Sequence, residues 1–358
     1  MRVLFVSCCP REHAVTRYRC THLAEALQFA GHRADVTWIG APLIRIDHDI
    51  VVLHRICANQ EGIALAGAVE RAGATLVYGT DDLVFDPDAA DLPEDVARFA
   101  ELHLLMLRRA ENLLASTDSL AEAACAWIPN VDVIGNFPGE TMLAAPLPER
   151  PPGTKFTLGY FSGSSTHDAD FAIITEPLAK FLTENAEKVR LRVVGPVVIP
   201  DSITNSGAEI EHLPLVPWQE LPALVAGCHI NLVPLTSTPL NEGKSAIKWQ
   251  EASLARVPTI ASPVGEFVRA IDHGKDGLLC ATPDDWYNAL RLLYIDPSRR
   301  AGMVSAAFVA VHNIAKVRRV RVPKVFENAM PKGTPWATTF KNPRGFVKSV
   351  AKKALGRV

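Results

Sequence analysis

Four polar side chains at helical spacing could do chemistry together: Asn241, Lys244, Lys248 and Glu251. On a helix that turns by about 100° per residue, these positions fall inside one arc of about 80°. An amide, two ammonium groups and a carboxylate would then share one helix face. Because the first N–H groups of a helix are unpaired and favour anions, two lysines at that end could hold a diphosphate. The carboxylate further along could bind sugar hydroxyls, for example a ribose diol.

The same residues could instead form a solvated face. A Lys248–Glu251 ion pair on such a face would stabilise the helix by only about 0.2–0.5 kcal/mol. The residues that follow favour a site, because the predicted helix leads directly into a short buried strand at 257–261 and a turn at Pro263 and Gly265. A solvated surface helix would not normally be continued in this way.

The start of the chain shows what kind of fold would position this face. Strands at 3–6 and 34–39 flank a helix at 17–30, which is typical of a doubly wound α/β domain. No G-x-G-x-x-G follows the first strand, so the dinucleotide-binding fingerprint is absent.

A second α/β pattern begins after a Pro-rich stretch at 147–153, which is the best domain boundary in the chain. At this length two domains are more plausible than one. The fold class is therefore α/β with two doubly wound, Rossmann-like domains. The predicted divisions are residues 1–150, 151–330 and a tail at 331–358.

Polar residues just past predicted strands are further candidates, since open α/β sheets bind ligands at the carboxyl ends of their strands. His54 and Arg55 follow one buried strand, and Asp81 follows the next, where it could equally be a turn or N-cap acid. In the second half, the loop after the first strand is built of small residues that could offer N–H groups and hydroxyls to a phosphate: Ser162, Gly163 and Ser164.

Composition excludes several classes of function. The 358 residues carry a formal net charge of −2, so the whole chain shows no nucleic-acid signal. Seven scattered cysteines include no C-x-x-C pair and no cluster at metal spacing, which favours reduced thiols, a cytoplasmic location and no metal site. No signal-peptide core and no apolar run of membrane-spanning length is present.

The charge is unevenly distributed. Residues 316–358 hold twelve Lys or Arg against one acid, a net charge of +11, which leaves −13 for residues 1–315. Within 344–358, an apolar stripe is flanked by cations, as in a basic amphipathic helix. Such a helix could lie on an anionic membrane, for example the inner face of the cell membrane, or it could dock on this protein or a partner.

The segment from Asn241 to Gly265 resembles the donor-binding motif of retaining GT-B glycosyltransferases of family 4. Glu251-Ala252 matches the second glutamate of that motif and the alanine after it, and Arg256-Val257-Pro258 and Ala261-Ser-Pro-Val-Gly265 match its strand and turn. The first glutamate is out of register, since Gly243 stands in its place and Glu242 precedes it. The stretches 221–234 and 273–279 also resemble that family.

The resemblance implies two domains facing across a cleft, a nucleoside-diphosphate-sugar as co-substrate, and neither cofactor nor metal. It implies transfer with retention to a glycan or lipid-linked acceptor, by front-face displacement. Glu242 and Lys244 would be catalytic, and Arg17, Tyr18 and Arg19 would border the acceptor side. The full implied sets are Ser162, Gly163, Ser164, Asn241, Gly243, Ser245, Lys248 and Glu251 for the donor, and Arg19, His54, Arg55 and Asp81 for the acceptor.

Two alternatives stay open. One is a non-catalytic GT-B module that binds a sugar nucleotide or a partner, which the shifted Glu242 and the uncharged 162–164 loop would suit. The other is a nucleotide-sugar epimerase, which would need an acid/base set that the sequence does not clearly show.

Overall fold

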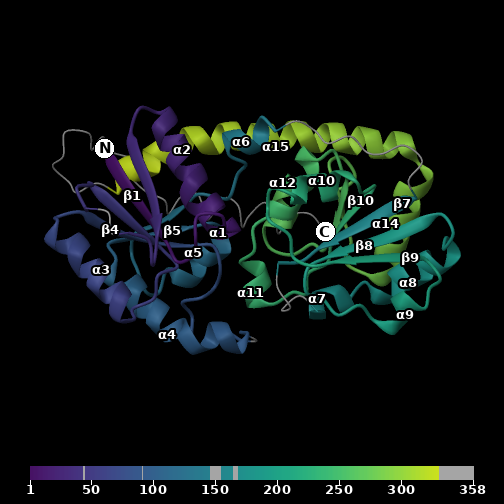
Figure 1. The fold of residues 1–358 in the computed structure, drawn as a ribbon, viewed down its shortest axis with the longest axis horizontal. Helices are drawn as coiled ribbons and strands as arrows, with labels where there is room; N and C mark the ends of the chain where they lie inside the picture. The colour runs from purple at the N-terminus through teal and green to yellow at the C-terminus, as the bar shows by residue number, and fades with distance from the viewer. Residues whose placement is uncertain (43–44, 91, 146–154, 164–167, 330–358) are drawn as a thin grey trace, which may run out of the picture.

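The computed structural model describes residues 1–42, 45–90, 92–145, 155–163 and 168–329. The described chain forms two lobes, each built on a twisted sheet with helices on its faces (Figure 1). Three sequence predictions fall outside the described residues: the linker at 147–153, Ser164, and the tail at 331–358.

The first domain is built on a parallel six-stranded sheet of the described residues, in the order β2-β1-β3-β4-β5-β6. Its strands are short and apolar because both faces are covered by helices. The strand order reverses between β1 and β3, so the loops after these two strands diverge and leave a crevice at their carboxyl ends. The strands are β1 (Arg2–Ser7), β2 (Arg33–Trp38), β3 (Ile50–His54), β4 (Thr75–Thr80), β5 (Asn112–Ala115) and β6 (Val131–Val133).

The second domain repeats this plan with the order β12-β11-β10-β7-β8-β9, also parallel. Read from the other edge, this is the doubly wound Rossmann order, with its reversal between β7 and β10. The prediction of two doubly wound α/β domains is therefore confirmed. The strands are β7 (Phe156–Phe161), β8 (Val189–Val194), β9 (Glu209–Leu213), β10 (Ile230–Val233), β11 (Thr259–Ala261) and β12 (Leu278–Leu279).

Helices cover both sheets. In the first domain the helices are α1 (Ala14–Thr16), a π-helical turn (Arg17–Thr21), α2 (His22–Phe29), α3 (Gln60–Arg71), α4 (Glu94–Arg109), α5 (Asp118–Ala124) and α6 (Glu140–Leu143). In the second they are α7 (Asp168–Ala172), α8 (Thr175–Glu184), α9 (Asp201–Thr204), α10 (Leu221–Ala226), α11 (Pro239–Glu242), α12 (Ile247–Leu254), α13 (Glu266–Ala270), α14 (Pro283–Ile295) and α15 (Pro297–Asn328).

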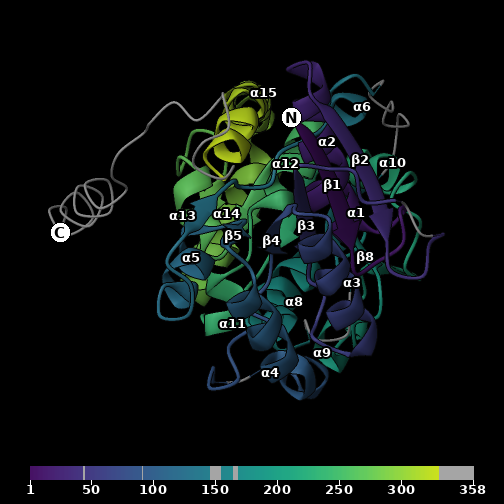
Figure 2. The same ribbon diagram turned by 90° about the vertical axis from the view of Figure 1, so that its left-hand side faces the viewer.

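The last helix, α15, joins the two domains. It runs along one side of both lobes, seen along its length in Figure 1 and nearly end-on in Figure 2. Its first half packs Ala307 and Val311 into a core of the second domain. Its last turns place Val322 and Phe326 in the core of the first domain. This helix thus runs without a break from the second domain back to the first.

A buried histidine determines how stability should depend on pH. His22 is 3% exposed, and its Nδ1 lies 2.8 Å from the carbonyl oxygen of Phe137. Burial lowers the pKa of its imidazole to about 4. Because the unfolded chain then binds the proton more tightly, this contribution to stability is complete above about pH 6.5 and is lost as the pH falls toward 4.

We expect urea unfolding to show a loss of stability over this window, of which His22 contributes at most about 3 kcal/mol. The loss should be smaller in His22→Asn, whose amide can donate to Phe137. His273→Asn, at an exposed position, should behave like the wild type. Equal pH dependence in wild type and His22→Asn would contradict the assignment.

Candidate functional site

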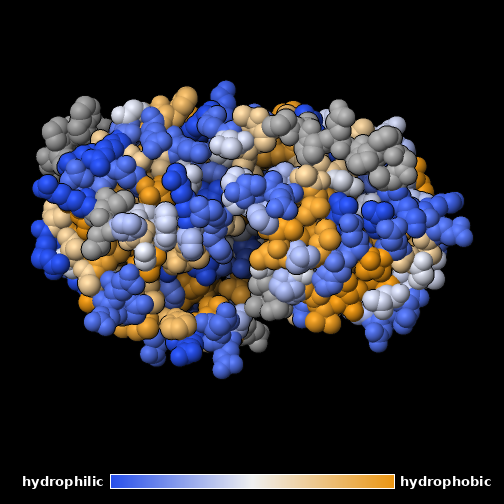
Figure 3. Space-filling view, viewed as in Figure 1, coloured by the Kyte–Doolittle hydropathy of each residue, from blue (hydrophilic) through white to orange (hydrophobic). Residues whose placement is uncertain are grey.

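The candidate site lies where the carboxyl ends of the two sheets approach each other, and the surface is hollowed there (Figure 3). The first domain contributes the residues that follow β1, β3 and β4. The second contributes those that follow β7 and β10, together with the start of α12. Both strand-order reversals open toward this region, which is where doubly wound sheets bind ligands.

The helix predicted over 241–251 is interrupted, which is a correction. The segment forms two short helices, α11 ending at Glu242 and α12 beginning at Ile247. Gly243 caps α11, and Ala246 has ψ 40°, outside the helical region. The single arc expected for the four polar residues therefore does not exist, although Lys248 and Glu251 still share a face of α12.

Glu251 is held by two side chains of the other domain. The Tyr18 hydroxyl donates to Glu251 Oε1 at 2.8 Å, and Arg17 Nη2 donates to the same oxygen at 3.2 Å. The Arg17 guanidinium also lies 4.3 Å from the centre of the Trp218 ring. The Glu251 side chain is 18% exposed, and burial raises the pKa of its carboxyl group.

The backbone places Arg17 and Tyr18 there through the π-helical turn that precedes α2. Such turns add a residue to a helix and are frequent at functional sites. The predicted position of these residues at the border of the cleft agrees with this geometry.

Lys244 is also paired across the domains. Its Nζ lies 2.7 Å from Asp82 Oδ1, and Arg55 Nη1 lies 2.9 Å from the other oxygen, Oδ2. Arg55 has φ +52°, a left-handed conformation that is strained for a side-chain-bearing residue and that is found most often at functional sites. Two cations from different domains thus converge on one carboxylate.

Beside this pair lies a second acid, Asp81, with His54 Nε2 at 3.2 Å from its Oδ1. Burial alone would raise the pKa of Asp81, but the His54 hydrogen bond and the Arg55 charge outweigh it and hold that pKa below its usual value. Burial lowers the pKa of His54. His54 Nε2 and the Asp81 carboxylate thus form a hydrogen-bonded pair at the acceptor side implied by the resemblance.

Lys248 faces the same region. Its Nζ lies 5.7 Å from the centre of the Tyr160 ring. Burial lowers the pKa of this ammonium group to about 8, although the Asp170 and Glu251 charges oppose the shift. A half-buried cation of this kind is well suited to an anionic ligand.

Asn241 and Glu242 brace the second domain from within. Asn241 is buried and donates to Asp170 Oδ1 at 2.9 Å and to the carbonyl of Thr236 at 3.0 Å. Glu242 Oε2 accepts from the N–H of Gly265 at 2.9 Å. The structure thus shows these side chains shaping loops beside the cleft, and their donor-binding and catalytic roles stay predictions.

Gly243 explains why no glutamate stands at that position. A Cβ there would lie 3.0 Å from Leu120 Cδ2 of α5, tighter than most real Cβ contacts. Its carbonyl oxygen accepts from Thr117 Oγ1 at 3.3 Å. The backbone at Gly243 therefore packs directly against the first domain, where a carboxylate side chain would separate the two.

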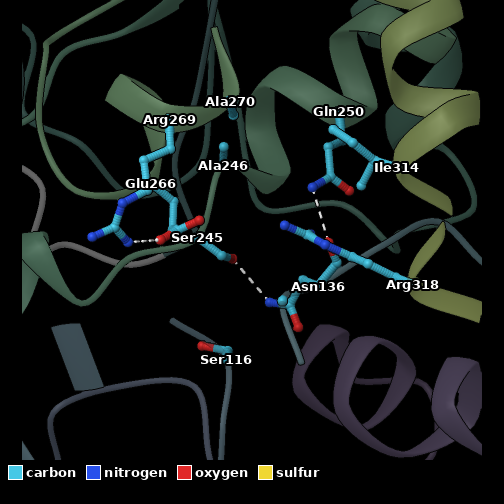
Figure 4. A pocket seen from close by; sticks show the side chains of 11 residues that line it. Ser116, Asn136, Ser245, Ala246, Gln250, Glu266, Arg269, Ala270, Ile314 and Arg318 are labelled. Atoms are coloured by element: carbon cyan, nitrogen blue, oxygen red, sulfur yellow. Dashed lines mark hydrogen bonds and ion pairs between the residues drawn. The ribbon is translucent and has the colours of Figure 1, made fainter. Parts of the chain in front are cut away.

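Three other predicted residues occupy different settings. Ser162 is buried, and its N–H donates to Val194. Gly163 has open space around its Cα. Ser245 Oγ accepts from Asn136 Nδ2 at 2.9 Å (Figure 4).

Arg19 points into the first domain. It is 1% exposed, and its Nη1 donates to the carbonyl of Ile134 at 2.6 Å and to Asn136 Oδ1 at 3.0 Å. The acceptor role assigned to Arg19 stays a prediction. In the structure its guanidinium binds the segment that follows β6.

Comparison with known proteins bears on this geometry. Residues 157–296 match a family model described as Glycosyl transferases group 1. No curated protein sequence matches the chain. Among solved structures, HepE of Anabaena in complex with UDP and glucose aligns with a TM-score of 0.65 at 16% identity, over 92% of this chain and 100% of its own. A glycosyltransferase from Rickettsia africae gives 0.63 at 11% identity over 93% and 100%.

A sucrose-phosphate synthase from Thermosynechococcus elongatus gives 0.59 at 12% identity, over 92% of this chain and 99% of its own. These alignments span both lobes and α15. The chain has the GT-B fold. The group 1 match in the second GT-B domain supports a glycosyltransferase.

Several residues at the GT-B cleft escaped the sequence predictions. Asp82 pairs with Lys244, although the sequence favoured its neighbour Asp81; only a partner 162 positions away distinguishes the two. The sequence analysis did not single out Trp218, whose ring meets the Arg17 guanidinium of the other domain. Asp170 had no motif to signal that it anchors Asn241 and Thr236.

Two searches of the described residues found nothing. No group of three or more His, Cys, Asp and Glu side chains in that part of the GT-B chain could hold a metal ion. None of the helices described is long and apolar enough to cross a membrane.

Proposed function

We propose that this protein is a retaining, metal-independent glycosyltransferase that moves a sugar from a nucleoside-diphosphate-sugar to a glycan or lipid-linked acceptor. The observation that carries the proposal is the convergence of Lys244, Lys248 and Glu251 on a cleft whose other wall holds Asp81 and Asp82. Cations lie on one side, and carboxylates that could orient acceptor hydroxyls lie on the other.

The leaving group explains the need for the lysines. As the bond to the anomeric carbon breaks, negative charge grows on the diphosphate and positive charge on the sugar. Cations already fixed beside the phosphate stabilise the developing charge without reorganising. We assign this task to Lys244 with Lys248, and the ribose diol to Glu251. Since no carboxylate is placed as a nucleophile, front-face displacement assisted by the leaving phosphate is the proposed route.

The donor would have to replace contacts that the two domains make to each other. Asp82 holds Lys244, and Tyr18 with Arg17 holds Glu251. Each first-domain group occupies a position that a phosphate oxygen or a ribose hydroxyl would take. Donor entry is therefore proposed to break these interdomain bonds, and closure around the substrates would then exclude water.

The nucleotide and the location are further proposals. UDP is the first nucleotide to test, since HepE of Anabaena and TarM of S. aureus were both solved with it. A cytoplasmic location suits the free thiols. A lipid-linked acceptor would give residues 344–358 a reason to contact the anionic inner face of the cell membrane.

The test is thermal stabilisation by diphosphates of uridine, guanosine, thymidine and adenosine and by their sugars. A ligand at about 100 times its dissociation constant, bound only by the folded state, adds about 2.7 kcal/mol of stability. We expect one base to stabilise the wild type, and Glu251→Gln and Lys244→Met to lose the effect. Lys275→Met removes an exposed lysine that pairs only with Asp272 in the described structure, so it should bind normally.

A non-catalytic GT-B module is the second candidate. Lys244 and Glu251 are each bound by side chains of the other domain, which would also suit a protein that has lost catalytic turnover. A module would bind a nucleotide-sugar without consuming it. Failure of every nucleotide to stabilise a well-folded sample would reject the donor site itself.

A further inference from the structure

Two adjacent cysteines, Cys8 and Cys9, follow β1 at the edge of the cleft. Both are half-buried, and their sulfur atoms lie 3.5 Å apart. The N–H of Cys8 donates to the carbonyl oxygen of His54 at 3.0 Å, so the pair lies beside the residues that follow β3. The proposed transfer reaction gives these two thiols no task.

His13, in the same loop, adds an imidazole to the pair. Its side chain shares a hydrogen bond with the Cys9 thiol. Its Nδ1 also accepts from the N–H of Val15 at 3.2 Å, at the start of α1, which fixes the orientation of the ring. The Arg55 guanidinium contributes positive charge from the loop after β3. Cys9 thus has a second thiol, an imidazole and a cation around it.

These neighbours determine which of the two sulfur atoms carries negative charge. The hydrogen bonds with Cys8 and His13 lower the pKa of the Cys9 thiol. The Arg55 charge acts in the same direction, while burial opposes it. The hydrogen bond with Cys9 and burial raise the pKa of Cys8. The Asp81 charge adds to that increase, and the Arg55 charge opposes it. Cys9 is therefore the thiolate of the pair, and Cys8 keeps its proton.

Other cysteines of the chain have different surroundings. Cys20 and Cys280 are buried, and burial raises the pKa of each thiol to about 12. Cys125 is exposed, and its thiol donates to the carbonyl oxygen of Ala121 at 3.1 Å. Accessible thiolates beside a second cysteine are the sites that peroxides oxidise most readily. Cys9 combines these features.

We propose that Cys9 is a site of reversible oxidation by peroxides, and that Cys8 resolves the oxidised form to a Cys8–Cys9 disulfide. With hydrogen peroxide, the Cys9 thiolate attacks one oxygen, the O–O bond breaks and hydroxide leaves, which gives a sulfenic acid. The Cys8 sulfur then attacks the Cys9 sulfur and the S–O bond breaks. The leaving hydroxide takes the Cys8 proton and becomes water. In total the two sulfur atoms lose two electrons, and peroxide becomes water and hydroxide.

A disulfide between adjacent residues is strained and therefore easily reduced. The Cα atoms of neighbouring residues are about 3.8 Å apart, whereas most disulfides join Cα atoms about 4.4–6.8 Å apart. Strained disulfides have higher reduction potentials and are the labile or regulatory ones. The bond would form under peroxide and be removed by ordinary thiols, as a switch requires.

Thr16 connects the pair to the contact between the domains. Its Oγ1 donates to the carbonyl oxygen of Cys9 at 2.8 Å. The ring closed by the disulfide contains the Cα atom that bears this carbonyl group, so closing it turns the acceptor of Thr16. Thr16 directly precedes the π-helical turn, whose first two side chains hold Glu251. Oxidation is therefore expected to weaken this contact.

The experiment treats the full chain with hydrogen peroxide at pH 7 and follows each cysteine by mass spectrometry. We expect the peptide that contains Cys8 and Cys9 to lose two hydrogen atoms, and dithiothreitol to restore it. In Cys8→Ser the product should instead be a sulfenic acid at Cys9, trapped by dimedone, because no second thiol resolves it. In Cys9→Ser the remaining thiol should react at least about tenfold more slowly than Cys9, since it is protonated.

His13→Asn tests the cause of the reactivity. Without the imidazole, the pKa of Cys9 returns toward the ordinary value, at which only a few per cent of a thiol is ionised at pH 7. The initial rate at pH 7 should then fall about tenfold. About one pH unit above the ordinary thiol pKa of about 8.5, both proteins hold the thiolate, and their rates should agree. A merely structural role of His13 would not produce this pH dependence.

Cys125 is the internal control, because its thiol is exposed. It should be oxidised at least about tenfold more slowly than Cys9 in the same sample. The oxidised wild type should also melt at a lower temperature than the reduced protein and recover on reduction. Melting temperatures of the reduced variants check that each one folds.

The proposal is overturned if Cys9 reacts no faster than Cys125, or if Cys9 accumulates as a sulfenic acid in the wild type without forming the bond to Cys8. An unchanged melting temperature in the oxidised protein would contradict the connection through Thr16. None of these results bears on the proposed transferase activity, whose test uses nucleotides with the reduced protein.

Discussion

Lys244→Met is expected to lower kcat/KM for sugar transfer by about 10²–10³-fold, through a higher KM for the donor as well as a lower kcat. The lysine would neutralise charge that develops on the departing diphosphate, and removing one preorganised donor of this kind typically costs about 3–4 kcal/mol of transition-state stabilisation. Methionine keeps most of the side-chain length without the charge. The measurement is initial-rate kinetics with the nucleotide-sugar identified by the stabilisation panel.

Asp82→Asn separates this role from a purely structural one. In the ligand-free protein Asp82 is the partner of Lys244, at 2.7 Å. If Lys244 mattered only for holding the domains together, both variants would lose activity to the same extent. We expect Asp82→Asn to lose much less, and to bind nucleotide more tightly, because Lys244 is then free of its internal partner. Equal losses would count against the phosphate role.

Phe326→Ala is expected to reduce the free energy of unfolding by about 3–5 kcal/mol. Phe326 is 1% exposed and lies in the core of the first domain, with its ring 5.6 Å from that of Phe5 in an edge-to-face arrangement. Truncation removes a large buried area and leaves a cavity where β1 cannot move inward. It also loosens the only turns of α15 that enter that core among the described residues.

The matched control is Val320→Ala, on the same helix and 58% exposed. Its effect on stability should stay within about 0.5 kcal/mol. Urea denaturation of both variants gives the comparison. A small loss in Phe326→Ala would mean that α15 does not anchor the second domain to the first.

The Lys244→Met and Phe326→Ala variants both probe how the two domains are held together, the first at the cleft and the second at α15. The domains touch through polar bonds at the cleft, such as Lys244–Asp82, and through apolar packing at α15. Polar contacts that are partly exposed are weak and can be replaced by a ligand. We therefore expect the apolar contact at α15 to persist when a ligand replaces the polar contacts at the cleft.

The sequence by itself determined the fold class. Short apolar runs separated by turns recur in both halves, and such local periodicity reports which segments are buried strands. The strand predicted at 3–6, for example, lies inside β1. Lys248 and Glu251 were also correctly placed on one helix face, because residues three positions apart on a helix lie on the same side of it.

Only the tertiary structure decided what these residues meet. Glu251 contacts Tyr18 across 233 positions of sequence, and no local pattern encodes such a pair. The break between α11 and α12, beside which Gly243 packs against Leu120 of the other domain, was likewise not visible in the local sequence. The burial of Arg19 depends on β6 and α15 in the same way. Periodicity identifies elements because it is a property of neighbours in the chain, whereas a site between two domains is assembled from residues that only folding brings together.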